Sequence, residues 1–225
     1  MAALMGQSGA GKTTLMDVIA GYKTGGKITG DILIHGAPKE DNLWQRISGY
    51  AEQNDILNPY LSVLETLEFT TKCRLPPETD HDEVMSQVIS LMHLEAYANT
   101  VVGREKDGEG LPKHARKRVT IANELVTQPR ILFLDEPTSG LGCNAAALVI
   151  GAVRRSTDAL GLITLATIHQ PSRKMFESFD DLLLLAKGGR VCWSGPMGVG
   201  SDAIFSHFGG IPGALPPLDS CNPAD

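Results

Sequence analysis

Short hydrophobic runs bounded by glycine, proline or aspartate recur along the 225-residue chain and alternate with segments of helical spacing. Such runs are typical of buried strands, and here they predict strands at residues 2–5, 131–134, 162–168 and 182–186. Strands that alternate with helices form parallel sheets. The pattern therefore predicts an α/β domain built on a largely parallel sheet.

Two further segments predict strands of another kind. Residues 28–34 and 190–194 are interpreted as strands of an antiparallel edge, and Gly188-Gly189 offers a tight hairpin turn before the second. The expected sheet is therefore mixed, mainly parallel with an antiparallel edge.

The middle of the chain has a helical character. Residues 63–73, 83–94 and 113–125 carry helical spacing, and Pro76-Pro77 separates the first two segments. These segments predict a helical subdomain inserted into the α/β core.

The same pattern suggests how one domain is divided. We expect an α/β core at residues 1–51 and 126–210 and the helical subdomain at residues 52–125. Residues 211–225 are rich in proline and show little periodicity, so they are interpreted as an extended connector.

Composition and charge weigh against two kinds of protein. The longest apolar runs, such as residues 145–153, fall far short of the roughly 20 residues that cross a bilayer, so no membrane-spanning helix is expected. The net charge of −6 gives no support to nucleic acid as a partner, because duplex binding depends on basic patches. The compact basic cluster Arg116-Lys117-Arg118 is interpreted as a solvated helix face or an interaction edge.

The cysteines indicate a reducing environment. Cys73, Cys143, Cys192 and Cys221 lie far apart, without the spacing of a zinc site or a redox pair. They are predicted to be ordinary reduced thiols, as is typical of cytosolic proteins.

A phosphate-binding motif follows the first predicted strand. Gly6-Gln7-Ser8-Gly9-Ala10-Gly11-Lys12-Thr13 matches the P-loop pattern and precedes a helical run at residues 14–20. Its glycines allow successive backbone N–H groups to face an anion, and the helix adds the positive end of its dipole. Lys12 is expected to reach the β- and γ-phosphates, Thr13 to place its hydroxyl on Mg²⁺, and Thr14 to contact the α-phosphate. The predicted nucleotide-binding residues are Gly6, Gln7, Ser8, Gly9, Ala10, Gly11, Lys12, Thr13 and Thr14.

Two carboxylates follow the predicted strand at residues 131–134. Ligands of open α/β sheets bind beyond the carboxyl ends of the strands, so Asp135 and Glu136 are expected to face the P-loop phosphates. Asp135 is predicted to hold Mg²⁺, directly or through water. Glu136 is predicted to orient or deprotonate the attacking water, because phosphoryl transfer requires mainly positioning and charge stabilisation.

Three more segments complete a pattern that resembles the nucleotide-binding domain of ABC transporters. They are Gln53 in the segment Gly49-Tyr50-Ala51-Glu52-Gln53-Asn54-Asp55, His169 after the strand at residues 162–168, and Ser139-Gly140-Leu141 after the two acids. The resemblance covers nearly the whole chain and implies a P-loop NTPase fold. Residues 20–26, 121–125 and 222–225 are similar to the G subfamily, especially to the second nucleotide-binding domain of its pleiotropic-drug-resistance members.

The resemblance implies roles for these residues. Gln53 would be the Q-loop residue that contacts Mg²⁺ and couples the nucleotide site to the membrane domain. His169 would be the switch histidine that hydrogen-bonds the γ-phosphate. The expected catalytic set is then Glu136, His169 and Gln53, the expected metal set is Thr13, Gln53 and Asp135, and the implied cofactors are ATP and Mg²⁺.

The sequence departs from the family pattern in two places. In the family each ATP lies between one domain's P-loop and the partner's Leu-Ser-Gly-Gly-Gln signature, and the matching residues here are Leu111-Pro112-Lys113-His114-Ala115. Pro112 lacks both hydroxyl and N–H, although it suits the first residue of a helix, and His114 carries a side chain where close backbone approach is needed. In the D-loop Ser139-Gly140-Leu141-Gly142, glycine replaces the family's aspartate. Both losses lie on the face that is offered to a second domain.

The resemblance therefore implies an asymmetric pair, in which a second nucleotide-binding domain supplies the intact signature. It also implies a transmembrane domain as partner and a position on the cytoplasmic face of a membrane, within a longer exporter. The aromatic residue that stacks on adenine in the family lies upstream of the first strand and cannot be assigned. Nor does the chain identify the transported substrate, which the transmembrane helices select.

Two alternatives remain open. The altered signature favours a non-catalytic, nucleotide-gated interaction module, which the intact Glu136 and His169 oppose. A soluble ABC ATPase is the other alternative, but such proteins usually carry two of these domains or a coiled-coil insertion.

Overall fold

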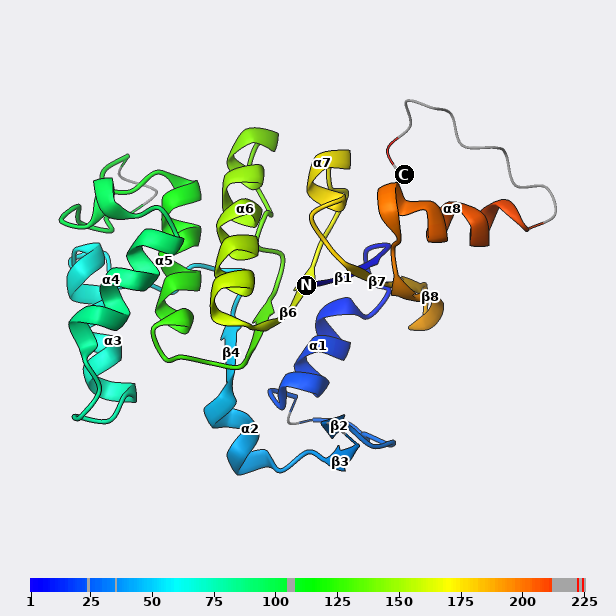
Figure 1. Ribbon diagram of the computed structural model, residues 1–225, viewed down its shortest axis with the longest axis horizontal. Coiled ribbons are helices and arrows are strands. Elements are labelled where there is room, and N and C mark those ends of the chain that lie inside the picture. The colour runs from blue at the N-terminus through cyan, green and yellow to red at the C-terminus, as the bar shows by residue number, and fades with distance from the viewer. Residues whose placement is uncertain (24, 35, 105–107, 212–221, 223, 225) are drawn as a thin grey trace.

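The computed structural model describes residues 1–23, 25–34, 36–104, 108–211, 222 and 224. Within these residues, a sheet of six strands has the order β4-β5-β6-β1-β7-β8 and passes through the middle of the molecule (Figure 1). Neighbouring strands are parallel except for the pair β7 and β8, which is antiparallel. The strands are β1 (Ala2–Gly6), β4 (Ser48–Ala51), β5 (Ile131–Leu134), β6 (Ile163–Thr167), β7 (Asp181–Ala186) and β8 (Arg190–Pro196). The predicted mixed, mainly parallel sheet with an antiparallel edge is confirmed.

The hairpin between β7 and β8 forms as its glycines predict. Gly188 and Gly189 have φ values of 83° and 77°, a conformation that side chains other than glycine's adopt at a cost. The strand predictions differ from the structure in two other places. Strand β4 was not predicted, and residues 28–34 do not form one strand of the main sheet.

The segment at residues 28–34 contributes only a short strand to a separate sheet. Leu33–Ile34 (β2) pairs with Ala37–Pro38 (β3) in an antiparallel pair of strands. Gly30 interrupts the segment with a φ of 106°, and Ile28 and Leu33 leave about half of their surface exposed. Since these side chains have no core to pack against, the run does not extend into a longer strand.

Helices lie on both faces of the main sheet (Figure 1). They are α1 (Lys12–Ala20), α2 (Asp41–Ile47), α3 (Val63–Arg74), α4 (His81–Leu91), α5 (Lys113–Leu125), α6 (Cys143–Leu160), α7 (Arg173–Phe176) and α8 (Asp202–Gly209), with short 3-10 turns η1 (Glu95–Tyr97) and η3 (Val199–Ser201). The predicted bounds of α5 agree with the structure. Helix α3 begins at a capping box, in which Ser62 and Glu65 satisfy each other's backbone N–H groups.

Alternate residues of β5 serve two separate cores, because successive side chains of a strand point to opposite faces. Ile131 and Phe133 pack with residues of α1 and α2, including the fully buried Met16. Leu132 and Leu134 pack on the other face with residues of α3 to α6. Buried on both faces, β5 is held in place at the centre of the fold.

The basic cluster on α5 is buried, so its interpretation as a solvated face or interaction edge is wrong. Arg116, Lys117 and Arg118 are only 8%, 3% and 5% exposed. Each cation instead donates to backbone carbonyl groups, Arg116 to Gly103, Lys117 to Gln53 and Arg118 to Met92. Three positive charges can be buried because each one has acceptors within hydrogen-bonding distance.

Some remaining predictions concern the surface and the end of the chain. Cys73, Cys143 and Cys192 are free and exposed, whereas Cys221 lies outside the described residues. Most of the predicted connector at residues 211–225 also lies outside them, as does Thr24. Among the described residues, no helix combines the length and apolarity needed to cross a membrane.

Candidate functional site

The order of the strands gathers the predicted site residues at one edge of the sheet. Strands β4, β5, β6 and β1 are consecutive neighbours and run in parallel, so their carboxyl ends share one edge. Gln53 follows β4, Asp135 and Glu136 follow β5, His169 follows β6, and the P-loop follows β1. Ligands of parallel α/β sheets bind at this edge.

The P-loop connects β1 to α1 through glycines that other residues would strain or block. A Cβ atom on Gly6 would lie 2.4 Å from the carbonyl oxygen of Leu185 on the neighbouring strand. Gly11, the residue before α1, has a φ of 97° and provides no side-chain cap, and the first turn of the helix contains no acidic residue. The first N–H groups of α1 therefore keep their capacity to bind an anion.

Lys12 lies folded over this loop. Its side chain is buried, and Nζ donates hydrogen bonds to the carbonyl oxygens of Gly6 at 2.9 Å and Gln7 at 3.2 Å. The backbone N–H of Ala10 also donates to Gln7, which closes the turn. Ser8, Gly9 and the side chains of Thr13 and Thr14 are exposed on the outer side. The loop is thus a rigid turn with a cation at its base.

Asp135 joins the end of β5 to the P-loop. Its Oδ1 atom accepts hydrogen bonds from Thr13 Oγ1 at 3.2 Å and from Thr167 Oγ1 at 2.7 Å. The carboxylate is only 7% exposed. The structure therefore brings together Thr13 and Asp135, two of the three residues that the sequence predicts to hold a metal ion.

Glu136 is linked to both neighbouring strands. Its Oε2 atom accepts a hydrogen bond of 2.9 Å from Gln53 Nε2, and its backbone N–H donates a bond of 2.7 Å to Thr167 Oγ1. Its φ of 45° lies in the left-handed region. Gln53 and Glu136, two of the predicted catalytic residues, are thus in direct contact.

His169 lies at the same edge but makes no such contact. The N–H of Ile168 donates to the carbonyl oxygen of Leu4, which continues the pairing of β6 with β1 up to the residue before His169. Within the described part of the chain, no hydrogen bond or ion pair joins the exposed His169 side chain to Glu136 or the P-loop.

The altered signature residues lie at the start of α5. Leu111 is buried, and α5 begins at Lys113, as the helical spacing of residues 113–125 predicts; Pro112, which suits the first position of a helix, instead lies just before it in an extended conformation. Burial, and then the positive charge of Arg118, lowers the pKa of His114 below its ordinary value. His114 is therefore expected to be neutral near pH 7, as a poor counter-ion for phosphate.

The signature and D-loop segments meet each other. A Cβ atom on Gly140 would lie 2.6 Å from Lys113 Nζ, which places the lysine side chain against the D-loop. Ser139 and Gly142 are exposed, whereas Leu141 is partly buried. A groove of about 950 Å³ follows this junction; the predicted site residues that line it are Gln53, Lys113, Ser139 and Gly140.

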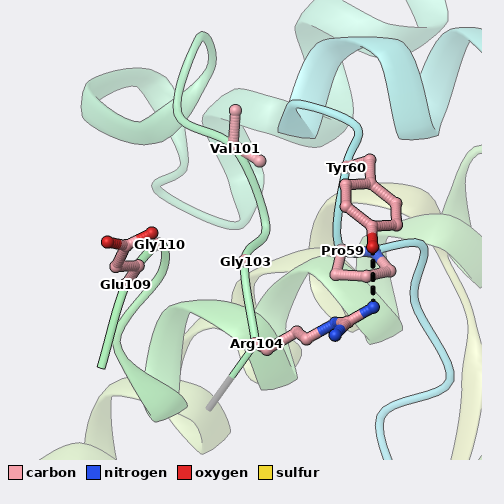
Figure 2. A pocket seen from close by; sticks show the side chains of 7 residues that line it. All are labelled: Pro59, Tyr60, Val101, Gly103, Arg104, Glu109 and Gly110. Atoms are coloured by element: carbon pink, nitrogen blue, oxygen red, sulfur yellow. Dashed lines mark hydrogen bonds between the residues drawn. The ribbon is translucent and has the colours of Figure 1, made fainter. Parts of the chain in front are cut away.

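A smaller hollow of about 360 Å³ lies beside this groove and contains none of the predicted site residues. Figure 2 shows the hydroxyl of Tyr60 pointing toward the guanidinium of Arg104, which donates to it at 2.7 Å. The hollow brings together none of the motif residues, and the Tyr60 hydroxyl already accepts this bond, so the edge of the sheet is the better candidate for a ligand site.

Sequence reasoning missed two residues that organise the site. Thr167 is a buried strand threonine, and only the fold shows that its hydroxyl bonds to the carboxylate of Asp135 and to the backbone N–H of Glu136. Lys117 belongs to the basic cluster, but its contacts with Asp55 and Gln53 depend on residues more than sixty positions away. No local signal in the sequence indicates either contact.

Comparisons with known proteins agree with this geometry. Residues 1–139 match the family model described as ABC transporter, and residues 169–225 match the model described as ABC-2 type transporter. ABC transporter G family member 36 of Arabidopsis thaliana is 48% identical over 227 residues, which cover 100% of this chain and 15% of that protein. ABC transporter G family member 51 of Oryza sativa subsp. japonica is 49% identical over 228 residues, covering 100% of this chain and 16% of that protein.

The solved structures show the same fold. The structure of cbiO1 from Clostridium perfringens, described as part of the ABC transporter complex cbiONQ, matches with a TM-score of 0.75 and 22% identity, covering 91% of this chain and 78% of that one. The chain spans only 15–16% of the length of the two G family relatives. The resemblance that its motifs indicated is confirmed, and the chain belongs to the ABC transporter family.

Proposed function

We propose that this chain is the ATP-binding and ATP-hydrolysing domain of an ABC membrane exporter, and that ATP turnover drives transport. The observation that carries the proposal is the contact of 3.2 Å between Thr13 Oγ1 and Asp135 Oδ1, which joins the P-loop to the acids at the end of β5. A structural turn would not need a glycine-rich loop, a buried lysine and two carboxylates at the same sheet edge.

The P-loop would hold the phosphates of ATP. Its backbone N–H groups and the start of α1 supply donors and positive dipole charge, and Lys12 supplies a full charge at the base of the loop. An acidic chain with a net charge of −6 can bind a polyanion in this way because the binding charge is local.

Thr13 and Asp135 fit a bound Mg²⁺. Both offer oxygen atoms, the ligands that Mg²⁺ prefers, and they already lie within hydrogen-bonding distance of each other. When bound, Mg²⁺ would neutralise part of the phosphate charge. Asp135 would keep its orientation through Thr167, and Gln53, whose amide nitrogen donates to Glu136, would offer its amide oxygen as a further ligand.

Glu136 is the residue proposed to act on the attacking water. Its carboxylate is partly exposed beside Gln53 and can accept a proton from water, while Lys12 compensates charge on the phosphoryl group. His169, at the adjacent strand end, is proposed to contact the γ-phosphate. Hydrolysis would then depend on positioning more than on covalent chemistry.

A second nucleotide-binding domain is proposed as the partner that completes the site. The N–H of Pro112 is absent, His114 carries a half-buried side chain, and Gly142 has no carboxylate. These features support the proposal that this face binds the ATP of a partner domain poorly. The residues proposed to bind this chain's own ATP are present. This division of residues supports the assignment of the chain to the second nucleotide-binding domain of a transporter of the pleiotropic-drug-resistance type.

A transmembrane domain is the other proposed partner. The match of residues 169–225 to the ABC-2 type transporter family and the length of the G family relatives support membership in a longer membrane protein. The domain would then work on the cytoplasmic face of the membrane, with Gln53 between the nucleotide site and the groove of about 950 Å³.

The alternative is a nucleotide-gated interaction module without turnover, which the altered signature favours. ATP hydrolysis by the purified chain, alone and mixed with a nucleotide-binding domain that has an intact signature, separates the two. The expected result is slow turnover alone and fast turnover in the mixture, with Glu136→Gln abolishing the increase but not ATP binding. Binding without hydrolysis in every mixture would favour the gated module instead.

A further inference from the structure

We propose that Thr167 is a positioning residue of the hydrolytic site, which holds both Asp135 and Glu136 through one hydroxyl group. The inference rests on the proposed function, since it concerns the two carboxylates that would carry out the reaction. It assigns a role to a side chain that matches none of the sequence motifs.

The hydroxyl of Thr167 bridges two consecutive residues. It donates a hydrogen bond of 2.7 Å to Asp135 Oδ1 and accepts one of 2.7 Å from the backbone N–H of Glu136. Thr167 is fully buried at 0% exposure, so water does not compete for these bonds. A threonine hydroxyl can donate one bond and accept another, and here it does both.

The second of these bonds supports a strained backbone. Glu136 has a φ of 45°, in the left-handed region, which a residue with a side chain adopts at a cost. The chain turns at this point, because the N–H of Ser139 donates to the carbonyl oxygen of Glu136 at 3.0 Å. Without the hydroxyl, the N–H of Glu136 would lose its partner and the turn would be free to relax.

The first bond keeps Asp135 oriented. Its Oδ1 atom accepts from both Thr13 and Thr167. Thr13 is exposed and is proposed to turn its hydroxyl toward Mg²⁺, whereas Thr167 is buried and paired in register with Leu4 of β1. Thr167 is therefore the donor that would remain on Asp135 while the metal is bound.

The fold supplies a rigid base for this role. Strand β6 lies between β5, which carries the acids, and β1, which leads into the P-loop. A side chain at the end of β6 can therefore fix the distance between the two halves of the site. Removal of a group that orients a metal ligand typically lowers metal affinity or activity about 10–100-fold.

The test compares Thr167→Val, which keeps the shape but lacks the hydroxyl, with Thr167→Ser, which keeps the hydroxyl. Thr164→Val is the matched control, because Thr164 is a buried threonine of the same strand whose hydroxyl bonds to Thr157 at 2.7 Å. The assembled transporter is assayed for kcat, for the Mg²⁺ concentration that gives half-maximal turnover, and for nucleotide binding without Mg²⁺. Melting temperatures measure the loss of stability of each variant.

The expected result is that Thr167→Val lowers kcat at least about tenfold and raises the Mg²⁺ requirement, with metal-free nucleotide binding retained. Thr167→Ser should recover most of the activity, and Thr164→Val should retain it at a similar loss of stability. If Thr167→Val does not fold, Thr167→Cys, with its weaker donor, takes its place. Equal effects of Thr167→Val and Thr164→Val would overturn the inference.

The failure of this inference can be distinguished from failure of the proposed function. If Glu136→Gln is inactive while Thr167→Val turns over normally, only the positioning role is wrong. If Glu136→Gln keeps full turnover, the proposed hydrolytic site itself is wrong and Thr167 has no site to position.

Discussion

The side-chain amide of Gln53 donates a hydrogen bond of 2.9 Å to Oε2 of Glu136, and so joins the loop after β4 to the acid after β5. The two residues are 83 positions apart in the sequence. Both side chains retain contact with solvent. A change in the loop that carries Gln53 would therefore alter the orientation of the proposed catalytic carboxylate.

We predict that Gln53→Glu lowers ATP turnover at least about tenfold, with ATP binding retained. The variant replaces a donor by a carboxylate beside Glu136, and two like charges at this distance favour protonation of one of them. Asn54→Asp is the matched control, because it adds the same charge to the next residue of the exposed loop. Equal losses in the two variants would mean that charge in the loop, and not the contact with Glu136, limits turnover.

The buried ion pair between Lys117 and Asp55 yields a prediction about stability. Lys117 Nζ lies 2.7 Å from Asp55 Oδ1, with side chains only 4% and 13% exposed, and also donates to the carbonyl oxygen of Gln53 at 2.8 Å. Lys117→Met would leave the Asp55 carboxylate without its counter-ion. We expect a loss of about 3–5 kcal/mol in the free energy of unfolding.

Denaturant unfolding measures this loss, with Lys72→Met as the control. Lys72 pairs with Glu68 on the surface of α3, where solvent screens the two charges, so the Lys72→Met variant should lose little stability. A Lys117→Met variant that unfolds like the Lys72→Met variant would contradict a stabilising role for the buried pair.

Glu124 gives a prediction about pH. Burial raises the pKa of its carboxyl above the ordinary value, and outweighs the lowering effects of the Tyr50 N–H and of Arg74. The folded protein therefore binds this proton more tightly than the unfolded chain. As the pH rises from the ordinary carboxyl pKa through the pKa of the folded state, Glu124 loses its proton and the free energy of unfolding decreases. Above the folded-state pKa, the full cost of burying the charged carboxylate is present.

Glu124→Gln removes this penalty and can still accept the N–H of Tyr50. We expect the variant to be more stable than the parent near pH 7, with the difference disappearing as the pH falls toward 4. Thermal unfolding at several pH values measures it, and Glu78→Gln at an exposed position should change little. A gain that is independent of pH would show that burial of the charge is not its cause.

The sequence predicts those parts of the fold whose signals are local. The P-loop, the acids after β5 and the bounds of α5 follow from neighbouring residues alone. Strand β4 was missed because Ser48–Ala51 is not a hydrophobic run, and it becomes a strand by pairing with β5. Tertiary pairing overrides a weak local preference in this case.

The errors at α5 and the omission of Thr167 have a common physical cause. A run of cations normally marks a solvated face. Here Arg116, Lys117 and Arg118 can be buried because they donate to backbone carbonyl groups from three other segments of the chain. Thr167 likewise matters through Asp135 and Glu136, which approach it only when β6 lies beside β5. Side-chain contacts of long sequence separation could not be predicted from spacing.

The asymmetric-pair hypothesis predicts that a restored signature makes the chain self-sufficient. Changing Leu111-Pro112-Lys113-His114-Ala115 to Leu-Ser-Gly-Gly-Gln, together with Gly142→Asp, would return a hydroxyl, backbone N–H groups and a carboxylate to the partner face. Two copies could then complete each other's sites. Turnover should rise at least about tenfold over the parent and depend on the square of protein concentration when the pair is dilute.

The new glycines shorten or loosen the start of α5, and each costs about 1 kcal/mol in a helix, so melting temperature is measured beside turnover. The same variant with Glu136→Gln should be inactive, which excludes a contaminating ATPase. Rapid turnover by the unaltered chain alone, independent of concentration, would contradict the hypothesis, because Pro112 and His114 would then not limit the site. A folded but inactive restored variant would contradict it as well, since the limiting defect would lie outside the signature and the D-loop.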